Sequence, residues 1–462
     1  MKNTLHTKLL PLALAFLLAP ALAPAEDLMA SYEAARDSDP TLKISMDQKL
    51  SVDEGVSQAT SQLLPQISAS YSFSDSHGSS TSQNFFPNND GTFQVVPSTS
   101  SSSGRGTTLQ GNLTQSIFDY SRWTARRAAV ELSKRGDATY RASEQDLLIR
   151  VSTAYFAVLT AEDSLTFSQA EEKALARQLD QANQRYEVGL SAITDVNEAK
   201  AQHDSSTAAV ITAQNVLDDA REALTEITGK PSGELKRLRE QLPMNEPTPN
   251  NQQAWVDQAL TDNPTLQAYA FSRDAASANI RTAYAGHLPT LSASMTYSNS
   301  PRWADNTGDR FPGSIHTNSS GSDTAIGLVL NVPIFTGGFV QSRVRQAVHD
   351  RDAASDTLEQ QTRAVVRATR NNYRAVIAGI SGVEARKQAV ISAKSALEAT
   401  QAGFEVGTRT IVDVLISQQQ LFQAQRDYSQ ARHDFVLNGL RLRQSAGTIE
   451  PKDLQEVNSL LE

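Results

Sequence analysis

Residues 65–74 (PQISASYSFS) alternate between apolar and small polar side chains with a period of two. Ile67, Tyr71 and Phe73 fall on one face, and serines fill the other. This alternation is typical of a β-strand whose two faces meet different surroundings. Residues 289–298 (PTLSASMTYS) carry the same pattern 224 residues later. The chain is therefore expected to contain an internal repeat.

The similarity between the two halves extends beyond these strands. YEVGLSAITDV at 186–196 matches FEVGTRTIVDV at 404–414, now with an offset of 218. The difference in offset falls mainly in residues 75–106, which are longer than their counterpart 299–322 and rich in serine, a composition typical of an exposed loop. The organisation predicted is a first repeat at 26–229, a linker at 230–250, a second repeat at 251–447 and a tail at 448–462.

Each repeat is predicted to contain the same elements in the same order: a helical arm, an outbound strand, a return strand, a very long helix and a shorter helix. The ranges are 27–62, 65–74, 107–118, 120–187 and 191–228 in the first repeat, and 251–286, 289–298, 324–334, 338–404 and 409–446 in the second. A helix of ~67 residues would reach ~100 Å. Apolar and small residues spaced by three and four indicate coiled-coil packing, with an ordinary solvated helical bundle as the alternative.

The polar faces of the four strands consist mostly of Ser, Thr, Gln and Asn and carry almost no charge. Strands of roughly 10 residues with one apolar and one polar face fit a transmembrane barrel around a wet lumen. Four strands do not close such a barrel, and an open edge cannot face lipid. Several copies of the chain must then share one barrel. Three copies would give twelve strands, although the pattern alone does not choose three over two or four.

The N-terminus reads as a secretory signal peptide over residues 1–25, with two lysines before an apolar run that ends in small residues. Cleavage is expected after Ala25, with Ala23 as the alternative. The remaining chain has 40 basic and 51 acidic residues, which disfavours nucleic acid as a partner. It has no cysteine and hence no disulfide or lipid anchor. Its histidines are isolated and no phosphate-binding loop is complete, so we expect no catalytic, cofactor or metal site.

EDLMASYEAARDSDPTL, YEVGLSAITDV and FEVGTRTIVDVL together resemble the TolC-type outer-membrane channels of Gram-negative bacteria. The resemblance covers essentially the whole mature chain. It implies a homotrimer in the outer membrane, with a twelve-stranded barrel that continues into an α-helical coiled-coil tunnel in the periplasm. It also implies a periplasmic adaptor and an inner-membrane efflux transporter or ABC exporter as partners. The function implied is the exit duct of a tripartite efflux pump, of a type I secretion system, or of both.

The resemblance also implies which residues close the periplasmic tip of the tunnel. Arg409 matches the family's arginine, and Thr194 and Asp195 match its partners. The family's tyrosine at this lock falls on Phe404, which has no hydroxyl group. Of the carboxylates that ring the entrance, Asp413 matches one, and the next falls on Ile416.

Simpler explanations exist for the charged residues among these. Asp195 and Asp413 occupy the first turns of predicted helices, where a carboxylate is favoured by the helix dipole and free N–H groups. Arg409 could be an ordinary surface arginine. Two other functions fit parts of this pattern: a passive outer-membrane porin and a trimeric adhesin with a coiled-coil stalk. A porin would not need such long helices, and an adhesin would place its strands once, at the C-terminus.

Overall fold

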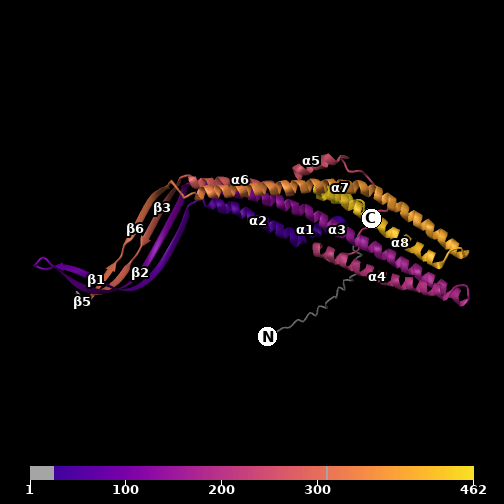
Figure 1. Ribbon diagram of the computed structural model, residues 1–462, viewed down its shortest axis with the longest axis horizontal. Coiled ribbons are helices and arrows are strands. Elements are labelled where there is room, and N and C mark those ends of the chain that lie inside the picture. The colour runs from indigo at the N-terminus through magenta and orange to yellow at the C-terminus, as the bar shows by residue number, and fades with distance from the viewer. Residues whose placement is uncertain (1–24, 309–310) are drawn as a thin grey trace, which may run out of the picture. The chain divides into compact units, whose positions relative to one another are not determined.

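The computed structural model describes residues 25–308 and 311–462, so the predicted signal peptide lies outside the described residues except for Ala25 (Figure 1). The chain forms two compact units. One comprises the residues up to 44, 141–263 and 364–462, and the other comprises 45–140 and 264–363. Each unit thus takes segments from both repeats.

The helices follow the predicted order. Their bounds are α1 Leu28–Ser38, α2 Pro40–Ser61, α3 Tyr120–Glu187, α4 Ile193–Thr228, α5 Gln252–Asp262, α6 Pro264–Tyr284, α7 Phe339–Glu405, α8 Ile411–Ser445 and α9 Pro451–Asn458, with a 3-10 turn at Ala285–His287. Within the described residues, no helix has both the length and the apolar character needed to cross a membrane.

The β-sheet lies entirely in the second unit. Its strands are β1 Gln66–Pro87, β2 Phe93–Phe118, β3 Thr290–Asn299, β4 Arg302–Gly308, β5 Phe311–Ser319 and β6 Ser322–Asn331. All pairings are antiparallel: β1 pairs with β2, the second half of β2 pairs with β3, and β3 pairs with β6. The first half of β2 pairs with β4, which pairs with β5.

The prediction of loops at 75–106 and 299–322 is wrong for most of these residues. β1 and β2 pair without a break from Gln66 and Thr114 to Pro87 and Phe93, so the Ser-rich segment is part of a long hairpin. Serine-rich composition is typical of loops, but an extended partner strand of matching length satisfies the backbone groups of such a segment equally well.

One face of this sheet is apolar and exposed. Tyr71 lies opposite Leu109, and Met295 lies opposite Ile326, with the four side chains exposed by between 41% and 78%. An apolar face of this extent is unusual on a surface that meets water. In the part of the chain that the structure describes, β1 pairs only with β2 and β6 only with β3, so both remain edge strands at this level.

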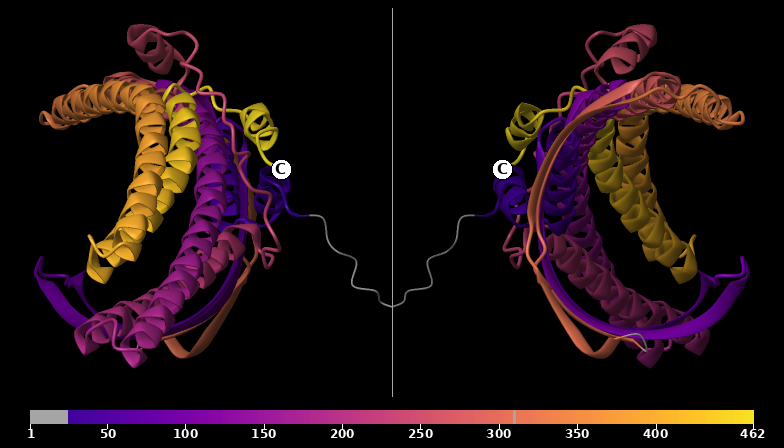
Figure 2. Two further views of the ribbon diagram at one scale, coloured as in Figure 1. Left: turned by 90° about the vertical axis from the view of Figure 1, so that its right-hand side faces the viewer. Right: turned by 90° about the vertical axis from the view of Figure 1, so that its left-hand side faces the viewer.

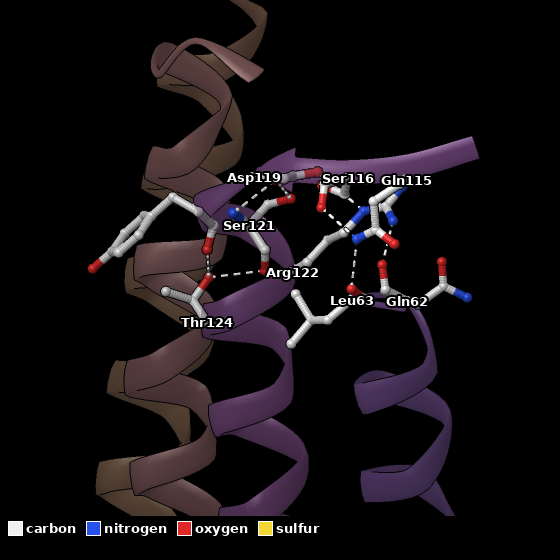
Figure 3. Close-up of polar contacts among 9 residues, drawn as sticks. Gln62, Leu63, Gln115, Ser116, Asp119, Ser121, Arg122 and Thr124 are labelled. Carbon is white, nitrogen blue, oxygen red and sulfur yellow. Dashed lines mark hydrogen bonds and ion pairs between the residues drawn. The ribbon is translucent and has the colours of Figure 1, made fainter. Parts of the chain in front are cut away.

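Polar contacts fix the point at which helix changes to strand in the second unit (Figure 3). Arg122, in the first turn of α3, forms an ion pair with Asp119 at 3.2 Å and donates to the carbonyl oxygen of Gln62 at the end of α2. The side-chain amide of Gln115 donates to the carbonyl oxygen of Leu63 at 2.9 Å. These bonds join the segment that follows α2 to the end of β2 and the start of α3.

Buried side chains of α3 provide much of the core of the first unit. Tyr155, Phe156, Val151 and Val158 are all at most 1% exposed. The hydroxyl of Tyr155 donates to the carbonyl oxygen of Lys236, which ties the segment between the repeats to this core. The part of α7 from residue 364 onward lies beside α8 in the same unit, as Figure 2 shows, and Val376 and Leu442 share a buried cluster there.

Candidate functional site at the hairpin turns

Each long helix of the first unit ends in a turn that leads into the next helix, and the two turns have the same geometry. At the first turn, the N–H of Leu190 donates to the carbonyl of Arg185, and Gly189 has φ +75°. At the second, the N–H of Thr408 donates to the carbonyl of Gly403, and Gly407 has φ +79°. Both are Schellman turns, in which glycine takes the left-handed conformation.

The second turn carries Arg409 and Asp413. Thr410 and Asp413 form a reciprocal capping box at the start of α8: the N–H of Thr410 donates to the carboxylate at 2.9 Å, and the N–H of Asp413 donates to the hydroxyl at 3.3 Å. Bonds from Thr410 and, more weakly, the charge of Arg409 hold the pKa of Asp413 below its ordinary value. Asp413 is therefore an ionised carboxylate that also caps its helix.

The first turn carries Thr194 and Asp195. They are the second and third residues of α4, whose N-cap, Ala192, offers no side-chain bond. Thr194 is exposed and Asp195 is half-buried. Among the described residues, the side chain of Arg409 forms no hydrogen bond or ion pair, so one chain does not bring it together with Thr194 or Asp195.

Phe404 and Ile416 differ in their surroundings. Phe404 packs against the buried cluster of Leu175, Ile411 and Leu415. Ile416 is 48% exposed on α8. Phe404, at the predicted lock, is thus a packing residue, and Ile416, at the predicted entrance ring, is a surface residue.

The structure adds Arg185, a residue that the sequence analysis missed. Its guanidinium carbon lies 4.9 Å from the centre of the Phe404 ring. Comparison of the two repeats offers a signal for this residue. Arg185 corresponds to Gly403, so the first turn has an arginine at a position where the second turn has glycine.

Further along the same helices, polar contacts join α3 to α8. Glu171 pairs with Arg426 at 2.9 Å, and Asp163 accepts a hydrogen bond from Ser429. His433, 3% exposed, lies 2.8 Å from the hydroxyl of Thr160 through Nδ1. The first helical hairpin (α3 and α4) and the second helical hairpin (α7 and α8) are therefore held together within one chain.

Comparison with known proteins identifies the chain. Residues 32–230 and 255–448 match the model of the outer membrane efflux protein family. The chain belongs to this family. It is 38% identical to the outer membrane protein TolC of Escherichia coli over 98% of this chain and 89% of that protein. It is 26% identical to the alkaline protease secretion protein AprF of Pseudomonas aeruginosa, over 93% of this chain and 86% of the relative.

A solved structure agrees in fold. The outer membrane channel CmeC of Campylobacter jejuni matches with a TM-score of 0.72 at 17% identity, covering 95% of this chain and 90% of that one. Membership of the outer membrane efflux protein family confirms a TolC-type channel with a helical tunnel and a β domain. The protein is an outer-membrane channel for efflux or secretion that extends into the periplasm, and such channels are ducts rather than enzymes.

Proposed function

We propose that three copies of this chain form one outer-membrane exit duct, which serves a tripartite efflux pump or a type I secretion system. A periplasmic adaptor would join the duct to an inner-membrane efflux transporter or ABC exporter. The observation that carries the sharing of one barrel is the sheet, and the number three comes from the resemblance to TolC-type channels. The apolar face of the sheet is exposed, and within the described residues β1 and β6 are unpaired at their outer edges, as expected if neighbouring copies complete a barrel in lipid.

The relatives support both forms of export. One relative is named for the secretion of alkaline protease, and the similar solved structure is named an outer membrane channel. A single duct suits both, because the choice of cargo would rest with the inner-membrane partner. Purification of the channel with its bound adaptor and transporter would test which of the two assemblies forms.

The closed tip is proposed to depend on Arg409 and on Thr194 and Asp195 of a neighbouring copy. Support comes from the free side chain of Arg409, which forms no bond within its own chain among the described residues, and from its exposure beside a charged capping box. An exposed ion pair contributes only ~0–1 kcal/mol. Three such pairs acting together would hold the tip closed and still let it open.

Replacing Arg409 by serine should raise the resting conductance of the channel in a planar lipid bilayer, because one side of each ion pair is lost. Arg177→Gln, a change at an exposed arginine on α3, is the control and should leave the conductance as in the wild type. A large wild-type conductance that Arg409→Ser leaves unchanged would contradict the proposed lock.

Three Asp413 carboxylates are proposed to converge at the entrance, where they would attract multivalent cations. Trivalent lanthanum should block wild-type conductance, and Asp413→Ala should abolish or strongly reduce this block. Glu198→Gln, at an exposed carboxylate on α4 outside the proposed lock, serves as the control for loss of a nearby charge. Equal block of the wild type and Asp413→Ala would show that the ring does not form the cation site. Because Asp413 also caps α8, helix content is measured in parallel by circular dichroism.

A further inference from the structure

We propose that Arg185 is a further gating residue, which holds the first and second hairpins of one chain together through the face of Phe404. Its role deepens the proposed function, since it acts at the same tip as Arg409. The contact differs in kind from the proposed lock: it lies within one chain and joins a cation to an aromatic ring instead of a carboxylate.

The surroundings of Arg185 favour this assignment. Its guanidinium lies 4.9 Å from the centre of the Phe404 ring, inside the range of cation–π contacts. Its Nε atom is buried and has no hydrogen-bond partner. In the described part of the chain, Arg185 takes part in no ion pair and is half-buried, so its guanidinium is stabilised by the Phe404 ring and by solvent. Such contacts strengthen as water is excluded.

The Phe404 ring is itself held in place. It packs on Leu175 of α3 and on Ile411 and Leu415 of α8. The arginine therefore closes one side of an apolar cluster that already spans both hairpins. Loss of the ring would remove the cation's partner, and loss of the cation would open the cluster to water.

The last turn of α7 lies close to two arginines, Arg185 and Arg409. Gly403 is next to Phe404, and a Cβ added there would lie 2.8 Å from Cγ of Arg409. The absence of a side chain at Gly403 thus makes room for the stem of Arg409, whereas its repeat counterpart is Arg185. We infer that the two arginines act on the same turn, one through Phe404 and the other through its neighbour in the assembly.

The experiment measures the distance between the two hairpin turns. The chain has no cysteine, so spin labels can be attached at Val188→Cys and Val406→Cys, both exposed positions on the turns. Labelled chains are diluted with unlabelled ones so that each measured pair belongs to one chain. Distance distributions are recorded by pulsed electron paramagnetic resonance on the full-length protein.

In the wild type, most chains should have a short distance between the two labels. Arg185→Gln and Phe404→Leu should each raise the ratio of chains with a long label-to-label distance to chains with a short one about fivefold, the effect of losing a partly desolvated cation–π contact. The double variant should add little to either single variant. Phe404→Tyr and Arg185→Lys, which retain the ring or the charge, should preserve most of the narrow population. Arg177→Gln is the matched control on the same helix.

Unchanged distances in Arg185→Gln, or effects of the two single variants that simply add, would overturn the assignment. Conductance of the same variants separates it from the proposed function. Wider distances without higher conductance would support the Arg185 contact but contradict gating at the tip. Higher conductance in Arg409→Ser together with unchanged distances in Arg185→Gln would support the gate and overturn the role of Arg185.

Discussion

Replacing Gly447 by alanine is expected to destabilise the first unit by about 2–5 kcal/mol. Gly447 follows the last residues of α8 and has φ +78°. A Cβ at this position would lie 2.5 Å from Cα of Asn263 and 2.6 Å from the carbonyl oxygen of Asp262. These are backbone atoms, so the clash is not relieved by rotating a side chain. The cost combines left-handed backbone strain with overpacking.

Other glycines of the same conformation provide controls. Gly407 has φ +79°, but nothing lies within 4 Å of its added Cβ, so Gly407→Ala should cost only the ~1–2 kcal/mol of strain. Gly229, the repeat counterpart of Gly447, is intermediate, because its nearest atom is the side-chain Cβ of Ser38 at 2.9 Å. Equilibrium denaturation followed by circular dichroism should show the largest loss of stability for Gly447→Ala, an intermediate loss for Gly229→Ala and the smallest loss for Gly407→Ala. Equal losses for Gly447→Ala and Gly407→Ala would show that the close approach to Asn263 is unimportant.

The helices could be predicted closely from sequence because each signal is local. The expected ranges 120–187 and 338–404 agree with α3 and α7 to within one residue at each end. Periodicity marks such helices along their whole length, and a glycine in the Schellman turn marks where each one ends. The repeat also let each half support the assignment of the other.

The Ser-rich strands could not be predicted in the same way. Whether residues 97–106 form a loop or a strand depends on whether they pair with β1, an earlier segment of the chain. Pairing is a tertiary property, and composition does not contain it. Arg185 was missed for a related reason: its partner Phe404 lies more than 200 residues away, on another helix.

The capping role of Asp413 was, by contrast, visible in the sequence. A carboxylate in the first turn of a predicted helix is favoured by the free N–H groups there, and the structure shows reciprocal bonds between Asp413 and Thr410. What Asp413 does in the assembly depends on neighbouring copies. That role remains a prediction, as do the roles of Arg409, Thr194 and Asp195.

Acidification from pH 7 to pH 4 should remove about 3 kcal/mol of stability through His433 alone. Burial lowers the pKa of this histidine to about 4; the carboxylate of Asp163 opposes the shift and the guanidinium of Arg432 adds to it. Thr160 donates its hydroxyl proton to the carbonyl of Phe156 at 2.7 Å, so it accepts a bond from Nδ1–H of neutral His433. This bond is available to both forms of the ring, so burial is what makes the folded state favour the uncharged one.

The sign follows from proton binding. Between the ordinary pKa of 6.5 and the folded value of about 4, His433 is protonated in the unfolded chain and neutral in the folded one. The unfolded state then binds more protons, so the free energy of unfolding rises with pH across this window and falls on acidification. Protonation in the folded state would cost Thr160 no bond, but it would place a charge on a side chain that is only 3% exposed.

Urea denaturation of the detergent-solubilised channel at pH 7 and pH 4 would measure the effect. His433→Gln should be less stable than the wild type at pH 7, because packing against Phe156 is lost, but should lose about 3 kcal/mol less between the two pH values. His203→Gln, on α4, controls for the removal of a histidine as such. The same pH dependence in His433→Gln and the wild type would mean that acid acts through carboxylates elsewhere. The contact between α3 and α8 would then not be sensitive to acid through its histidine.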